Sequence, residues 1–126
     1  MKSFINYTND RLTAIMLKYG VFFAYNQKQF NENKKDGVKY TRLDAGILCP
    51  SDNVDAFIKD TDDLDTVARQ ERVDEYGIDA IIYDELDNYE CWYTDDPSDA
   101  IKELVQYEGI TKEMVLSKFY GKGELT

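Results

Sequence analysis

Three short apolar runs along the chain are each followed by a polar residue that can cap a helix and then by an amphipathic segment. The runs are Val21–Tyr25, Gly46–Cys49 and Glu90–Thr94. Short runs rich in aromatic and β-branched residues are typical of strands, and a polar residue after such a run favours a helix start. After the first run, Asn26 and Gln29 have the spacing of a capping box. The pattern therefore predicts three short strands, each leading into a helix.

Helical periodicity covers most of the remaining sequence. Glycines at positions 20, 77 and 121 follow three of the periodic segments, and glycine is common just past the end of a helix. One segment, residues 78–89, has a β-prone start, so a strand is the alternative there. Residues that share a face at this spacing are Leu12, Ile15, Met16 and Tyr19; Val54, Phe57 and Ile58; Leu64, Val67, Ala68, Val73 and Tyr76; Ile78, Ile81, Ile82, Leu86 and Tyr89; Ala100, Ile101, Leu104 and Val105; and Met114, Val115 and Phe119.

These elements predict a helix-rich α+β fold, with five to seven helices packed on a small sheet of about three short strands. Three strands are too few for a doubly wound sheet. The 126 residues fit a single domain, 1–126, with the last few residues frayed. No apolar stretch approaches the ~18 residues of a membrane span, and no signal peptide is evident, so we expect a cytoplasmic protein. The predicted core comprises Phe22, Ile47, Leu48, Ile82, Trp92, Ile101, Leu104 and Val115.

The histidine and cysteine content of the chain limits the catalytic and metal sites that it can form. The chain has no histidine and only two cysteines, Cys49 and Cys91, which excludes histidine-based triads and a zinc site within one chain. We expect both thiols to be reduced and buried, because each lies in an apolar run. An EF-hand-like spacing from Asp60 to Glu71 lacks the ligand and glycine of a calcium loop, which favours an acidic helix instead. We predict no catalytic residues, no metal site and no cofactor.

Net charge is concentrated in one part of the chain. Residues 1–50 carry eight basic and four acidic residues, whereas residues 52–99 carry three basic and 17 acidic ones, a balance of −14. Phosphates would be repelled by such a surface, so direct nucleic-acid binding is not expected. A protein with a basic surface is the better partner. The alternative is that the acidic residues serve solubility alone. If they form a contact surface, the predicted partner-binding residues are Asp62, Asp63, Asp65, Asp74, Glu75, Asp84, Glu85 and Asp87.

The aromatic segment Tyr89–Tyr93 has two interpretations. Strand alternation would place Cys91 and Tyr93 on one face and Trp92 on the other, and the rings would then serve as core and sheet cover. Alternatively, the segment is a protein-binding hot spot, since tryptophan and tyrosine are enriched there.

Three stretches of the chain carry a family resemblance: Tyr19–Phe30, Leu43–Pro50 and Asn88–Asp95. They resemble a family of small uncharacterised proteins encoded by bacteriophages and prophages, over roughly Asn6 to Phe119. The resemblance implies a phage accessory protein in a bacterial cytoplasm. It assigns no activity, cofactor or functional residue.

Together, the acidity and this setting predict a non-enzymatic inhibitor of a host defence system, of the anti-CRISPR or antirestriction type. Its acidic surface would imitate nucleic acid and occupy a basic channel. One alternative is a phage regulatory or assembly factor that binds another protein without mimicry, and another is a small acid-based hydrolase. The sequence leaves the oligomeric state open.

Overall fold

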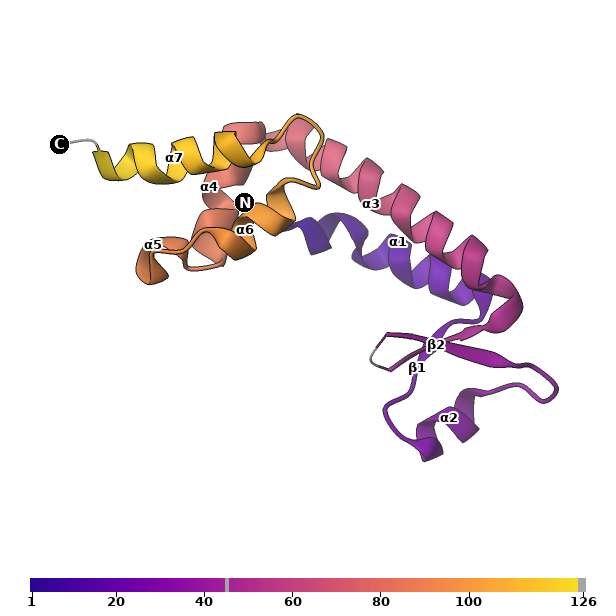
Figure 1. Cartoon of the computed structure of the whole chain (residues 1–126). Coiled ribbons are helices and arrows are strands. Elements are labelled where there is room, and N and C mark those ends of the chain that lie inside the picture. The colour runs from indigo at the N-terminus through magenta and orange to yellow at the C-terminus, as the bar shows by residue number, and fades with distance from the viewer. Residues whose placement is uncertain (45, 125–126) are drawn as a thin grey trace. The chain divides into compact units, whose positions relative to one another are not determined.

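The protein is described by a computed structural model that covers residues 1–44 and 46–124. Within these residues the chain forms seven helices and a three-stranded sheet, which confirms the predicted helix-rich α+β fold (Figure 1). In chain order the elements are α1 (Phe4–Tyr19), β1 (Phe22–Phe23), α2 (Gln27–Asn33), β2 (Tyr40–Asp44), β3 (Ile47–Pro50), a 3₁₀ turn η1 (Ser51–Asn53), α3 (Val54–Tyr76), α4 (Ile78–Asn88), α5 (Cys91–Thr94), α6 (Ser98–Leu104) and α7 (Lys112–Glu124).

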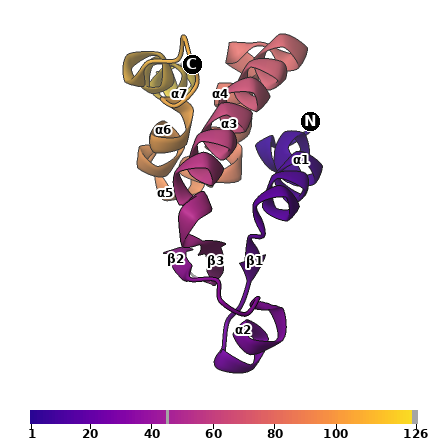
Figure 2. The same cartoon turned by 90° about the vertical axis from the view of Figure 1, so that its right-hand side faces the viewer.

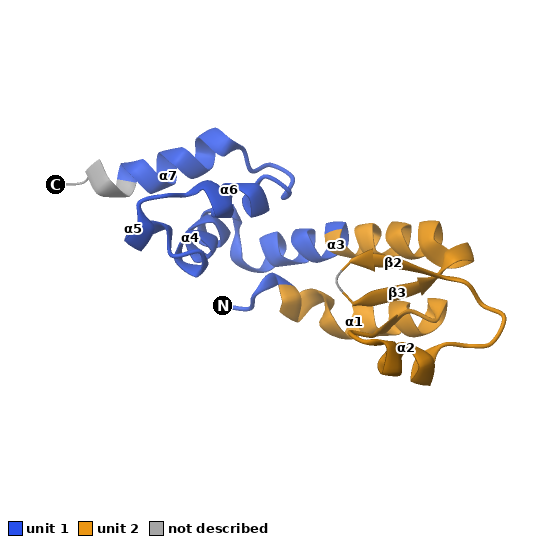
Figure 3. Ribbon diagram, turned by 60° about the horizontal axis from the view of Figure 1, so that its bottom comes forward, with its two compact units in different colours: residues 1–4, 66–126 blue, residues 5–65 orange. Residues whose placement is uncertain are grey.

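The chain divides into two compact units (Figure 3). The sheet unit, Ile5–Asp65, holds α1, α2, the three strands and the first half of α3. The helical unit, Met1–Phe4 with residues 66–126, holds the second half of α3 and helices α4 to α7. Two compact units can still unfold as one cooperative body. The single domain predicted over residues 1–126 therefore stays a prediction.

The sheet is antiparallel with strand order β1-β3-β2 (Figure 2). Phe22 pairs with Leu48, which pairs in turn with Arg42, so these three residues share one face of the sheet. The opposite face packs on α1 and α3. There Val21, Cys49 and Phe57 form a buried cluster, flanked by partly buried residues that include Ile15, Met16, Tyr19, Leu43, Ile47 and Val54.

The Leu48 face of the sheet is covered by the short helix α2. Phe30 of α2 lies 6.2 Å from Phe22 and 5.6 Å from Tyr40, measured between ring centroids. The predicted cap is present, because the Asn26 side chain accepts a hydrogen bond from the Gln29 amide at 2.9 Å. In a capping box the Gln29 side chain would accept a hydrogen bond from the Asn26 amide. Here its Oε1 atom accepts from the preceding amide, that of Tyr25, at 2.7 Å. None of the seven residues of α2 is buried.

The predicted third strand is wrong. Glu90–Thr94 forms helix α5 and its flank, and the missing strand is β2, Tyr40–Asp44. The predicted placement of Cys91 and Tyr93 on one face of a strand is therefore also wrong, because Cys91 is buried whereas Tyr93 is 91% exposed. An isolated apolar run needs a partner strand to become a strand itself. This segment packs against a helix instead, since the Trp92 ring stacks on Phe119 of α7 with ring centroids 4.8 Å apart.

The helical unit has a larger core than the sheet unit. It is built from α4, α5, α6, α7 and the segment before α7, and residues 78–88 are helical throughout, which decides against the strand alternative. Ten residues form the buried cluster: Ile81, Ile82, Leu86, Cys91, Ala100, Leu104, Tyr107, Ile110, Val115 and Phe119.

Half of the predicted core residues are buried. Leu48, Ile82, Leu104 and Val115 are buried, whereas Phe22, Ile47, Trp92 and Ile101 are only partly covered. The predicted apolar faces are too wide, because Ile58 and Val67 of α3, Tyr89 at the end of α4 and Val105 at the end of α6 are exposed. Cys49 and Cys91 are buried and free of a disulfide, as predicted, and burial raises the pKa of both thiols.

Helix ends follow the glycine prediction at two of three positions. Gly20 and Gly77 have φ angles of 73° and 83°, in the left-handed region that favours glycine, and end α1 and α3. At Gly121 the prediction is wrong, because α7 continues to Glu124. Helices tolerate an interior glycine at a cost of about 1 kcal/mol. The sequence predicts fraying of residues 123–126, but residues 123–124 are helical, and residues 125–126 lie outside the described residues.

Candidate functional site: the acidic helical unit

The excess negative charge belongs mainly to the helical unit. Its sequence contains 15 acidic and seven basic residues, a balance of −8, whereas the sheet unit contains ten acidic and eight basic residues, a balance of −2. Most of these acidic side chains are solvent-exposed. The exposed acidic residues of the helical unit are Glu71, Asp74, Glu75, Asp79, Asp87, Glu90, Asp95, Asp96, Asp99, Glu108 and Glu113.

Three of these carboxylates share one face of α3. Asp74 and Glu75 follow Glu71 by three and four residues, which makes each of them a neighbour of Glu71 on the helix surface. The Asp74 carboxylate accepts a hydrogen bond of 2.8 Å from Gln70 on the same helix. All three are exposed, so α3 presents a row of carboxylates to solvent.

A buried arginine organises the carboxylates of α4. The Arg72 side chain is fully buried and donates to Asp84 at 2.5 Å, to Glu85 at 2.9 Å and to the Tyr107 hydroxyl at 3.0 Å. Burial by itself would lower the pKa of Arg72, but the hydrogen bonds to Tyr107 and Glu85 outweigh it and raise the pKa. Burial raises the pKa of Tyr107. The guanidinium is therefore a permanent charge that two carboxylates compensate.

This network corrects one predicted partner-binding residue. The sequence places Glu85 on the surface, but it is only 6% exposed and its carboxylate is bonded to Arg72. It stabilises the fold and offers no contact surface. Asp84 remains partly exposed beside it, and Asp87 is exposed while it accepts a 2.8 Å hydrogen bond from the Trp92 indole.

The other predicted residues are divided between the two units. Asp74 and Glu75 lie in the helical unit, whereas Asp62, Asp63 and Asp65 lie in the sheet unit, on its part of α3. Asp63 forms an ion pair of 2.7 Å with Lys59, one turn earlier. The acidic block of the sequence is therefore two groups of carboxylates, and the group in the helical unit is the larger.

Helix α5 presents an aromatic side chain within this acidic surface. It is bracketed by Glu90 and Asp95, whose φ angles of 55° and 57° are left-handed, a conformation that is uncommon for residues other than glycine. Between these two residues, the Tyr93 side chain is 91% exposed. After Asp95, the Asp96 carboxylate accepts hydrogen bonds from the Ser98 amide and hydroxyl, at 3.0 and 2.6 Å. Tyr93 is thus an exposed tyrosine that is flanked in the sequence by the exposed acidic residues Glu90 and Asp95.

Sequence reasoning missed Arg72 and Tyr107. A signal for Arg72 was available, because it continues the buried series Leu64, Ala68 and Arg72 at four-residue spacing on α3. A charged residue on the apolar face of a helix indicates a buried ion pair. Tyr107 follows α6 in a turn, where periodicity gives no comparable signal.

The acidic side chains do not form a metal centre in the part of the chain that the structure describes. Within residues 1–44 and 46–124, no cluster of three or more histidine, cysteine, aspartate or glutamate side chains is arranged to hold a metal ion. The acidic stretch from Asp60 to Glu71 lies inside α3, in helical rather than loop conformation. Among the same residues, no helix has both the length and the apolar character needed to cross a membrane.

Comparison with known proteins identifies a family. A family model described as a family of unknown function (DUF7659) matches residues 4–120, which is most of the chain. No curated protein and no solved structure matches the chain.

Proposed function

The chain belongs to DUF7659, a family of unknown function, and we propose that it is a non-enzymatic binding protein whose helical unit contacts a basic surface of a partner protein. The observation that carries this proposal is the exposure of eleven carboxylates on a unit whose net charge is −8. A surface of one sign steers a partner of the opposite sign and accelerates association.

Rigid placement of the carboxylates supports the finer proposal of nucleic-acid mimicry. Asp84 is fixed by the buried Arg72 and Asp87 by the Trp92 indole, while Glu71, Asp74 and Glu75 are held on one helix face. Such an array can occupy a channel that normally binds phosphates. In this proposal the partner is a bacterial defence nuclease of the CRISPR or restriction type, and the protein is a phage-type inhibitor in the host cytoplasm.

A second candidate function rests on Tyr93. An exposed tyrosine is a typical anchor of a protein interface, and its ring can also receive an arginine or lysine side chain. This feature favours a regulatory or assembly factor that binds another protein through an aromatic contact, without mimicry. The two functions differ in how strongly binding depends on salt, because only the first relies on many charges together.

The test is a pull-down from bacterial lysate with mass spectrometry, using charge variants of equal net charge. The first variant neutralises Glu71, Asp74, Glu75, Asp79 and Asp87 of the helical unit to their amides. Single exposed charges contribute little, so the group is changed at once. We expect this variant to lose the partner that the wild type retains at low salt, and added duplex DNA to displace that partner from the wild type.

The matched control neutralises five exposed carboxylates of the sheet unit: Asp10, Asp36, Asp44, Asp52 and Asp55. It should retain the partner, since it removes the same charge elsewhere. Equal loss in both variants would leave only a general charge effect and would overturn the proposed contact surface. A partner that resists high salt and DNA, but is lost in Tyr93→Ala, would support the second candidate.

A further inference from the structure

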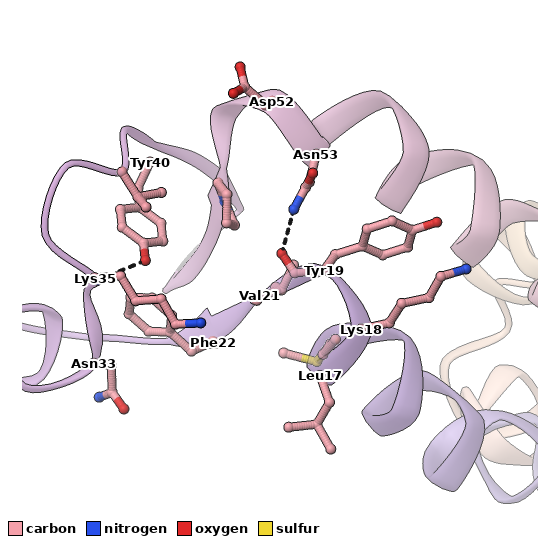
Figure 4. Close-up of a pocket in the computed structure, with 14 residues that line it drawn as sticks. Leu17, Lys18, Tyr19, Val21, Phe22, Asn33, Lys35, Tyr40, Asp52 and Asn53 are labelled. Atoms are coloured by element: carbon pink, nitrogen blue, oxygen red, sulfur yellow. Dashed lines mark hydrogen bonds between the residues drawn. The ribbon is translucent and has the colours of Figure 1, made fainter.

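A pocket of about 580 Å³ opens in the sheet unit, and its lining includes none of the predicted partner-binding carboxylates (Figure 4). It lies between the C-terminal end of α1, strand β1, the end of α2 with the following loop, and η1. Pockets of 300–1,000 Å³ are typical of small-molecule sites. Its lining residues come from Met16–Phe22, Asn33, Lys35, Val38, Tyr40, Pro50, Asp52 and Asn53.

The framework of the pocket is held by hydrogen bonds. The side-chain amide of Asn53 donates a hydrogen bond of 2.9 Å to the backbone carbonyl of Tyr19, which joins the end of α1 to η1. On the other side, the Lys35 backbone amide donates to the Tyr40 hydroxyl at 3.0 Å and holds the loop after α2 against the sheet. Both contacts are drawn in Figure 4. The pocket is therefore a built feature of the sheet unit.

One wall of the pocket is apolar and incompletely covered. Phe22 and Tyr40 meet edge to face at 5.3 Å and form an aromatic wall. Leu17 and Val38 line the pocket while they remain 78% and 39% exposed. Large apolar side chains exposed around a hollow favour a ligand with an apolar, planar body.

The charge near this wall is positive. Lys35 extends from the loop toward the interior of the pocket, whereas the Asp52 carboxylate points away from the other lining side chains (Figure 4). Lys18 forms an ion pair of 3.4 Å with Asp60 of α3. Residues 34–42 around Lys35 carry four basic residues and one acidic residue, a balance of +3. An anionic group is thus favoured next to Lys35.

We propose that this pocket binds a planar aromatic carboxylate, with the ring against Phe22 and Tyr40 and the carboxylate beside the Lys35 ammonium. The ring would cover apolar surface that the fold leaves exposed at Leu17 and Val38. The site belongs to the sheet unit and is independent of the proposed protein-binding surface, so either proposal can fail without the other.

The test is a titration of the full chain with 1-naphthoate, followed by amide chemical shifts in ¹H–¹⁵N spectra. We expect saturable shifts at Val21, Phe22 and Val38. 1-Naphthamide, which has the same ring and no charge, should bind about two- to fivefold more weakly, the range of one exposed charge contact. Lys35→Gln should reduce naphthoate affinity by the same factor and leave naphthamide affinity unchanged.

Two variants of exposed residues complete the design. Val38→Glu places a negative charge at the edge of the pocket and should weaken naphthoate binding more than Lys35→Gln does. Lys28→Gln removes a lysine of α2 that does not line the pocket, and should leave binding unchanged. Equal affinity for naphthoate and naphthamide, an equal effect of Lys28→Gln, or absence of saturation at millimolar naphthoate would each overturn the proposal.

Discussion

The two units of the molecule bury their chains in different ways. The helical unit has a cluster of ten buried apolar residues and, beside it, a fully buried arginine with two carboxylates and a tyrosine. The sheet unit has a cluster of three buried residues and a helix, α2, with none. The helical unit, which has the larger core, carries most of the net negative charge. The sheet unit, which has the smaller core, carries the 580 Å³ pocket.

The contrast in packing indicates how each unit can bind. A well-packed unit holds its exposed side chains in fixed positions, which suits recognition by a charged surface. A sheet face covered by one short helix leaves hollows, which suits recognition of a small molecule. The proposed protein-binding surface and the proposed ligand pocket follow from these two kinds of packing.

The largest effect is expected from Arg72→Met. This change leaves the buried Glu85 carboxylate without its partner, and breaking a buried ion pair typically costs about 3–5 kcal/mol. Urea unfolding measures the loss. Adding Glu85→Gln should recover part of it, because the unpaired buried charge is removed. If Arg72→Met unfolds like the wild type, the helical unit is not organised around this network.

A comparable loss is expected in the apolar core of the same unit. Leu104→Ala should lower the free energy of unfolding by about 2–5 kcal/mol, because Leu104 is fully buried. Its neighbour Val105 is exposed, so Val105→Ala is the matched control and should change stability by less than about 0.5 kcal/mol. Similar losses in both variants would mean that α6 packs on the core with another face.

A smaller and local effect is expected in the sheet unit. Asn26→Ala removes the cap of α2 and should cost about 1 kcal/mol. Because no residue of α2 is buried, the cost should appear as faster amide exchange within residues 27–33 and leave the midpoint of global unfolding nearly unchanged. The matched control is Lys28→Ala, since Lys28 lies on the same helix, is exposed and is not the capping residue. This control should leave exchange unchanged. A fall in the global midpoint on Asn26→Ala would show that α2 is integral to the sheet unit.

The smallest effect is a pH dependence in the sheet unit. The hydrogen bond from the Tyr19 hydroxyl, 2.6 Å long, lowers the pKa of Asp60 below its usual 3.8. A lowered pKa in the folded state stabilises the protein above the unfolded-state pKa, and this contribution is lost as the pH falls through the folded-state value. Tyr19→Phe should therefore reduce stability at neutral pH and have little effect well below pH 3.8. Equal effects at both pH values would contradict this assignment.

Much of the fold could be predicted because the helices are strongly periodic. The helix at residues 78–88 and the glycine ends at Gly20 and Gly77 are predicted from local sequence and are present. The third strand could not be identified in this way, because Tyr40–Asp44 becomes a strand through its pairing with β3. Glu85 illustrates the same limit at the candidate site, since its burial depends on Arg72, which lies 13 residues earlier on another helix.

The position of the sole tryptophan has a spectroscopic consequence. Trp92 stacks on Phe119 and bonds to Asp87, so all of these contacts lie within the helical unit. Tryptophan-selective fluorescence will therefore report the melting of the helical unit, whereas far-ultraviolet circular dichroism will report both units. Coincident transitions would establish one cooperative domain, and separated transitions would give each unit its own melting temperature.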